Sequence, residues 1–175
     1  MKLKTLLLLL FFFSFSSFAQ EDESEIVKAI DDLTMRWDNE AEMLQTYEGL
    51  ASFCAHSTYR NMITEMLDEI HHYDTLLYGI VTRKFKKDKD KEAKATLDDI
   101  EKLEVDYTTK SFRIFIRKEC QTYNDIERNL GAEQGPEYDE EVEALEAELS
   151  KYVIEITKQI DLIDEHVHHL HLGED

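Results

Sequence analysis

The amino-acid sequence predicts an all-α protein built as an antiparallel up-down-up-down four-helix bundle. Apolar residues recur at intervals of three and four along most of the chain, which is the spacing of one face of an α-helix. The 175 residues include five Gly and one Pro, too few turn-forming residues for a β-sandwich. The two cysteines also lie symmetrically about a polar turn, as a helical hairpin would place them.

Residues 1–19 have the features of a cleaved secretory signal peptide. Two lysines precede an apolar run, and the small residue Ala19 ends the segment at a suitable cleavage position. The apolar run, residues 6–13, is shorter than the roughly 20 residues that a membrane-spanning helix needs. We therefore expect a single exported domain, residues 20–175, secreted or periplasmic, with no membrane span in the mature chain.

The first half of the mature chain carries two apolar stripes, each typical of one face of an amphipathic helix. The phase of the pattern breaks between Gly49 and Ser57, so we place the first connection there. A lysine-rich segment, residues 86–90, marks the next turn. The first stripe consists of Ile26, Ile30, Leu33, Trp37, Ala41 and Leu44, and the second of Tyr59, Ile63, Met66, Ile70, Tyr73, Leu77 and Val81.

The second half predicts a third helix with a break and a long fourth helix. Apolar residues on either side of segment 108–111 lie on different helix faces, rotated by more than about 90°. The residues on the first face are Leu97, Ile100, Leu103 and Tyr107, and those on the second are Phe112, Phe115, Ile116, Tyr123, Ile126 and Leu130. Segment 108–111 holds two threonines, a lysine and a serine, whose modest helix propensity predicts a kink or break there. Gly135-Pro136 marks the start of the fourth helix, whose apolar stripe continues to Leu170.

The two cysteines, Cys54 and Cys120, predict a structural disulfide and support the bundle topology. An exported protein meets an oxidising compartment, where paired cysteines are usually bridged. The midpoint of the two positions is residue 87, inside the lysine-rich turn, so an antiparallel hairpin folded there brings them side by side. Two buried free thiols are the alternative. A catalytic thiol is disfavoured because the chain has no Cys-x-x-Cys.

The C-terminal segment offers ligands for a surface metal ion. Four of the seven histidines lie within six residues, and pairs three apart could share a zinc, copper or nickel ion. Asp164 or Glu165 could add a carboxylate. The alternative is electrostatic, because imidazolium groups complement the negative end of a helix dipole. The four histidines are His166, His168, His169 and His171.

A buried di-iron centre is disfavoured, although two Glu-x-x-His motifs occur. The hairpin register places both motifs, residues 69–72 and 165–168, at one height of the bundle. The acids expected nearby are Asp31, Asp32, Glu101 and Glu104. The side chains of the two motifs project away from the apolar stripes, whereas the ligands of such a centre must converge on the core. The chain also lacks the Cys-x-x-Cys-His motif of covalently attached haem. We therefore expect no bound cofactor beyond the surface metal.

Charge limits the partners that the protein can have. The sequence holds 39 acidic and 20 basic residues, and a formal net charge of −19 disfavours binding to nucleic acid. A basic tract, residues 83–94, and an acidic tract, residues 137–148, fall at opposite ends of the predicted rod. The basic end could therefore dock on an acidic protein partner or on a second copy of the chain.

Motifs of catalysis do not occur in the sequence. Gly is too scarce for a phosphate-binding loop, and there is no Gly-x-Ser-x-Gly or His-Glu-x-x-His. We therefore predict an exported, non-catalytic helical binding or accessory protein of the cell envelope. The alternative is a metal-binding or metal-buffering protein that acts through the C-terminal histidines, and an enzyme with an unrecognised site is the third possibility.

Overall fold

The computed structural model describes residues 23–88, 91–130 and 135–169, and all regular secondary structure in these residues is α-helical. The predicted all-α fold class is therefore confirmed. The predicted signal peptide, residues 1–19, and His171 lie outside the described residues. The helices are α2 (Glu23–Leu44), α3 (Tyr47–Ala55), α4 (Ser57–Asp88), α5 (Lys91–Leu103), α6 (Val105–Asn129) and α7 (Pro136–His169).

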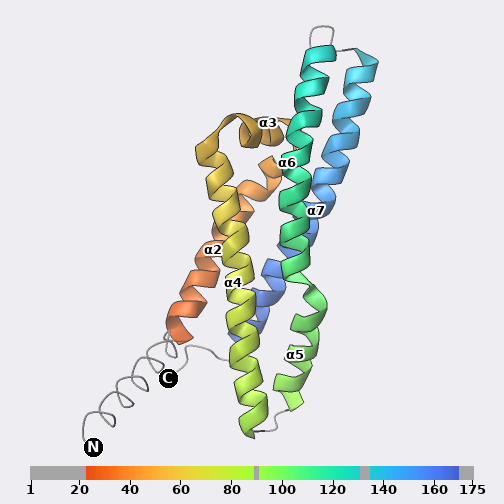
Figure 1. Cartoon of the computed structure of the whole chain (residues 1–175). Coiled ribbons are helices and arrows are strands. Elements are labelled where there is room, and N and C mark those ends of the chain that lie inside the picture. The colour runs from red at the N-terminus through yellow and green to blue at the C-terminus, as the bar shows by residue number, and fades with distance from the viewer. Residues whose placement is uncertain (1–22, 89–90, 131–134, 170–175) are drawn as a thin grey trace, which may run out of the picture.

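The helices form an elongated bundle, and α7 runs along much of its length (Figure 1). Helices α4 and α5 meet at one end, and α6 and α7 meet at the other. Helix α2 packs mainly on α7, while the short helix α3 packs on α6 and α4. None of the described helices is both long and apolar enough to span a membrane.

The apolar stripes of the sequence meet in the core. Trp37 and Phe112 are among the largest side chains that are fully shielded from solvent. The indole N–H of Trp37 donates a hydrogen bond to Oγ1 of Thr157 at 2.9 Å, which satisfies the polar atom of this side chain and connects α2 to α7. Other buried residues of the predicted stripes are Ile30, Leu33, Leu44, Ile63, Met66, Ile70, Leu77, Val81, Leu145, Leu149, Val153, Ile156, Ile160, Ile163 and Val167.

A short helix, α3, occupies most of the segment that the sequence predicted as a connection, which corrects that prediction. Its N-cap is Thr46, whose Oγ1 accepts a hydrogen bond from the backbone N–H of Gly49 at 3.0 Å. Leu50 and Phe53 are buried, and they fall outside the phase of α4 because they belong to this separate helix. Close packing requires Gly49, since a Cβ there would lie 1.9 Å from the carbonyl oxygen of Met43.

The third predicted helix is broken, but at Glu104, so the predicted position of the break at residues 108–111 is wrong. Glu104 separates α5 from α6 and has a left-handed backbone, with φ 49° and ψ 35°. Tyr107, which the prediction placed in the apolar stripe of α5, is exposed, whereas Thr109 is buried in the stripe of α6. The Thr109 hydroxyl donates to the carbonyl of Val105 at 2.8 Å, so this residue is accommodated within the helix.

Gln159 on α7 supports the break from inside the core. Its side chain is almost completely buried, and its Nε2 donates to the carbonyl oxygen of Leu103 at 2.5 Å and to Oγ1 of Thr108 at 2.9 Å. The carbonyls of the last helical turn lack intrahelical partners, so the bond to Leu103 satisfies a group that the end of α5 exposes. Gln159 therefore holds the junction of α5 and α6 through two part-buried hydrogen bonds.

Cys54 in α3 and Cys120 in α6 lie side by side. Their sulfur atoms are 2.02 Å apart and their Cα atoms 5.4 Å apart, a separation usual for a protein disulfide. The pair is consistent with the disulfide predicted from the hairpin register. It connects two helices that lie far apart in the sequence, because the two cysteines are separated by 66 positions.

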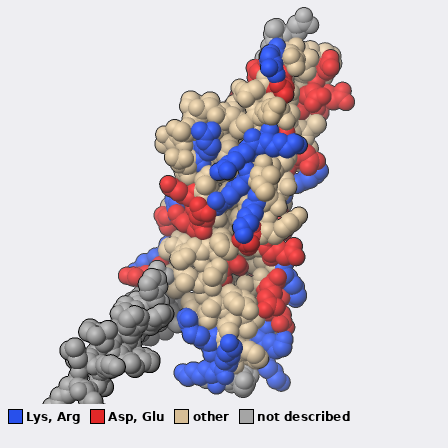
Figure 2. All heavy atoms as spheres, viewed as in Figure 1, with Lys and Arg blue, Asp and Glu red and all other residues tan. Residues whose placement is uncertain are grey.

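The two ends of the bundle carry different charges. Figure 2 shows lysine and arginine side chains gathered at the end where α4 and α5 meet, and acidic side chains toward the end where α7 begins; further lysine and arginine side chains cross the upper half of the same face. Lys86 and Lys87 stand in the last turn of α4, and Glu137 and Asp139 stand in the first turn of α7. Each charge complements the dipole of its helix at these positions.

Candidate functional site

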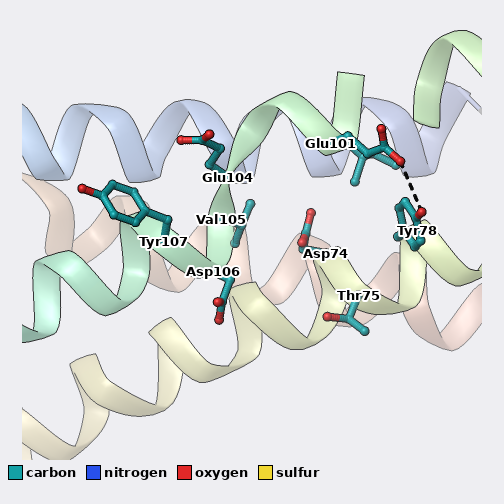
Figure 3. Close-up of a pocket in the computed structure, with 9 residues that line it drawn as sticks. Asp74, Thr75, Tyr78, Glu101, Glu104, Val105, Asp106 and Tyr107 are labelled. Atoms are coloured by element: carbon teal, nitrogen blue, oxygen red, sulfur yellow. Dashed lines mark hydrogen bonds between the residues drawn. The ribbon is translucent and has the colours of Figure 1, made fainter. Parts of the chain in front are cut away.

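An open pocket of about 600 Å³ lies where α4 faces the junction of α5 and α6 (Figure 3). We call it the junction pocket. Its volume falls within the range of roughly 300–1,000 Å³ that is usual for small-ligand sites. Its wall combines part of α4 with the end of α5 and the start of α6. The polar and aromatic side chains that matter for its chemistry are Asp74, Tyr78, Glu101, Glu104, Asp106 and Tyr107.

The break between α5 and α6 lies in the wall of this pocket. Glu104, at the break, has a left-handed backbone. In Figure 3 Glu101 lies on the same side as Asp74 and Tyr78, whereas Glu104 and Tyr107 point to the other side. Asp74 and Tyr78 are four residues apart and therefore share a face of α4. In Figure 3 Asp74 points from α4 toward the junction, and the Tyr78 hydroxyl donates to Oε1 of Glu101 at 3.2 Å. Left-handed backbone costs a non-glycine residue about 1 kcal/mol, a form of strain that is concentrated at functional sites.

Asp74 is a partly buried acid at the inner side of the pocket. Its Oδ1 atom is inaccessible to solvent and accepts no hydrogen bond from the described residues. Burial raises the pKa of Asp74 to about 6; His71 opposes this rise, and the Asp106 carboxylate adds to it. The pKa of Asp106 is itself lowered, chiefly because Lys110 donates a hydrogen bond to it. Asp74 is therefore charged at neutral pH but lacks the donors that usually stabilise a shielded carboxylate.

The pocket carries more negative charge than the neighbouring cations balance. Lys102 pairs with Asp99 at 3.0 Å, and Lys110 pairs with Asp106 at 2.6 Å. Tyr107 is 69% exposed, so its ring is open to a ligand. Carboxylates beside an open aromatic ring form a favourable environment for an organic cation. Within the described residues, no Lys or Arg forms an ion pair with the other acids of the pocket, which are Asp74, Glu101 and Glu104.

The predicted histidine ligands at the end of α7 are not gathered into one cluster by the described structure. His168 lies against two aspartates, with its Nε2 3.0 Å from Oδ1 of Asp31 and 3.5 Å from Oδ1 of Asp164. The hydrogen bond to Asp31 raises the pKa of His168. His166 is half-buried, and its Nε2 has no hydrogen-bond partner among the described residues, while His169 is exposed. His171 is outside the described residues.

The two Glu-x-x-His motifs do not converge on the core. Glu69 forms an ion pair with Arg36 of α2 at the surface of the bundle. His72 is exposed beside the ring of its neighbour Tyr73, and Glu165 is exposed on α7. Their positions agree with the outward projection predicted from the helical phase.

The sequence analysis did not predict the junction pocket. The hairpin register placed Glu101 and Glu104 at one height, but it did not connect them with Asp74 or Asp106. Tyr107 was assigned to an apolar stripe, although a tyrosine is amphipathic and can stand at a surface. The helical phase of the apolar residues changes sharply next to Tyr107. This change was the signal in the sequence that could have drawn attention to Tyr107.

Comparisons of the chain with protein-family models, with curated proteins and with solved structures find no match.

Proposed function

We propose that this chain is an exported, non-catalytic helical binding protein that holds a positively charged organic group in the junction pocket. The ligand class is an alkylammonium or guanidinium group, such as a lysine or arginine side chain of a partner protein. The observation that carries the proposal is the set of carboxylates that no Lys or Arg neutralises, beside the exposed ring of Tyr107.

Several features of the pocket favour an organic cation over a bare metal ion. Metal ligands must approach one another closely, and the acids of the junction pocket form no such group of three in the described structure. A volume of about 600 Å³ accommodates an extended ligand that meets separate carboxylates. The phenol rings of Tyr78 and Tyr107 add contacts with the methylene groups and the charge of such a ligand. The net charge of −19 also accelerates the approach of cations.

The proposal places this pocket on an antiparallel four-helix bundle outside the cytoplasm. The apolar leader and the pairing of Cys54 with Cys120 support export, because disulfides persist in oxidising compartments. The meeting of α4 with α5 at one end, and of α6 with α7 at the other, supports the up-down order of the helices. The break at Glu104 is then an interruption of the third helix of the bundle.

The proposal can be tested by calorimetric titration of the purified protein with two probes. Spermidine represents a free amine, and a short lysine-rich peptide represents a basic segment of a partner protein. The double variant Asp74→Asn/Glu101→Gln is expected to weaken the binding of at least one probe about tenfold, equivalent to about 1.4 kcal/mol. Tighter binding of the peptide would indicate that the ligand is a basic segment of a protein partner. Tighter binding of spermidine would indicate that the ligand is a free amine.

The control keeps the net charge equal. The double variant Glu140→Gln/Glu143→Gln removes the same two charges from the exposed acidic tract of α7. It is expected to change the affinity less than twofold. If both double variants weaken binding equally, the cations follow the overall charge of the protein, and the junction pocket is not the site.

A second copy of the chain is another source of basic side chains. Lys86 and Lys87 stand at the basic end, in the last turn of α4. If Lys86→Glu/Lys87→Glu abolishes a salt-sensitive self-association seen by sedimentation equilibrium, the cation comes from a second copy. An external partner predicts that the protein is monomeric and that this variant behaves like the wild type.

A further inference from the structure

Three side chains that could bind a metal ion meet where α2 packs against the end of α7. Asp31 of α2 and Asp164 and His168 of α7 each offer one ligand atom, and these atoms lie within 4.8 Å of one another. The Nε2 atom of His168 is the common neighbour, 3.0 Å from Oδ1 of Asp31 and 3.5 Å from Oδ1 of Asp164. Asp164 and His168 are four residues apart and so share one face of α7.

A second observation indicates that this cluster accommodates a positive charge. The Oδ1 atom of Asp164 is inaccessible to solvent and accepts no hydrogen bond from the described residues. A pocket of about 430 Å³ opens beside it between α2 and α7, and Asp31, Asp38 and Asn39 line this pocket. Thr34 also lines it, and the Thr34 hydroxyl is buried without a partner in the described residues. Such an oxygen-lined space can hold the water molecules that complete the coordination of a metal ion.

We propose that Asp31, Asp164 and His168 bind a divalent transition-metal ion, with zinc as the best match. Zinc accepts carboxylate oxygen and imidazole nitrogen ligands, and three protein ligands leave one position for water. Calcium and magnesium fit less well, because they prefer sites made entirely of oxygen.

The geometry needs little adjustment to form this site. Ligand atoms bond to zinc at about 2.0–2.2 Å, so two of them in a tetrahedral site are about 3.4 Å apart. The observed separations of 3.0 and 3.5 Å are close to this value, and no pair exceeds 4.8 Å. The side chains of Asp31 and His168 are exposed and that of Asp164 is half-buried. The bound ion would connect α2 to α7 and would share no residue with the junction pocket.

Zinc binding can be measured by competition with a chromophoric chelator, using protein purified without a polyhistidine tag. We expect one zinc ion per chain to be retained in millimolar magnesium. Asp31→Asn, Asp164→Asn and His168→Gln are each expected to weaken zinc affinity about 10–100-fold. The matched controls, His169→Gln and Asp32→Asn, change a neighbouring histidine and a neighbouring acid and should leave the affinity within about twofold.

Two further readouts do not depend on affinity alone. Zinc is expected to raise the midpoint of thermal unfolding of the wild type, and to raise it much less in Asp31→Asn. X-ray absorption of the zinc complex should show oxygen and nitrogen ligands that include a single imidazole. Two or more imidazoles, or equal losses in His168→Gln and His169→Gln, would overturn the assignment in favour of the histidine tail. Binding of several weak zinc ions that none of the variants affects would also overturn the assignment. It would mean that zinc binds to scattered acidic side chains on the surface.

Discussion

Replacement of Asp74 by asparagine is expected to stabilise the protein at neutral pH. The Oδ1 atom of Asp74 is shielded from water and has no hydrogen-bond donor among the described residues. The ionised carboxylate also stands near Asp106, which raises the pKa of Asp74, while Glu101 and Glu104 line the same pocket. Asparagine has nearly the same shape and removes the charge, so the unfavourable burial of that charge disappears.

The magnitude follows from the pKa of this group. The pKa of Asp74 is about 6 in the folded protein, against 3.8 for an ordinary aspartate. Each pKa unit corresponds to about 1.4 kcal/mol, so a fully shielded carboxylate would carry a cost of about 3 kcal/mol. Asp74 is only partly buried, and screening by solvent reduces the expected effect to about 1 kcal/mol.

The sign of the pH dependence is also defined. Because the pKa is higher in the folded than in the unfolded state, the stability linked to Asp74 is fully present below about pH 4 and is lost as the pH rises through about 6. Urea unfolding should therefore show Asp74→Asn to be more stable than the wild type at pH 7.5, and the difference should vanish near pH 4.

The control for this experiment is Asp125→Asn. Asp125 is an exposed residue of α6 that pairs with Arg128. Its replacement should cost no more than about 0.5 kcal/mol at pH 7.5. A destabilised Asp74→Asn, or a gain in stability that is the same at pH 4 and pH 7.5, would refute the description of Asp74 as a shielded charge.

Three further predictions concern the fold. Chemical unfolding of the Cys54→Ala/Cys120→Ala variant should show a loss of up to about 4 kcal/mol, because the bridge closes a loop of 66 residues in the unfolded chain; an unchanged midpoint would contradict a bridge in solution. Glu104→Gly should raise the unfolding free energy by about 0.5 to 1 kcal/mol, because glycine removes the left-handed strain at φ 49°, whereas a loss would mean that Glu104 stands in an ordinary helix. Trp37→Phe should cost about 2 kcal/mol in urea unfolding, because it leaves a cavity and removes the hydrogen bond to Thr157; a cost near zero would place Trp37 outside the core.

The long helices were readable from the sequence because each repeats its apolar spacing over many turns. The start of α7 at Pro136 followed from the preference of proline for the first helical position. Helix α3 was missed because nine residues are too few to show a stripe, and its burial depends on packing against α6. The position of the break was misjudged because Tyr107 was counted as apolar, and because a left-handed Glu104 has no characteristic sequence pattern, unlike glycine or asparagine at such a position.

The candidate sites were harder to predict from the sequence than the helices, because their residues come together only in the tertiary structure. Histidine density at the end of the chain drew attention to His168, but the partner Asp31 comes from α2 and appears only when α2 packs on α7. Asp74 lies four residues after Ile70 and three before Leu77, within the apolar face of α4, and an acid at such a position was a signal that the sequence analysis did not use. Its shielding results from the α5–α6 junction that faces it, which local periodicity does not describe.

The most direct test of the account is to map the bound cation on the protein by nuclear magnetic resonance. Backbone amides of isotopically labelled protein would be followed during a titration with spermidine at moderate salt. If the cation binds in the junction pocket, the largest shifts should fall in residues 74–78 and 100–107, which border it. Larger shifts in the acidic tract at residues 137–148, or shifts spread evenly over the surface, would contradict it.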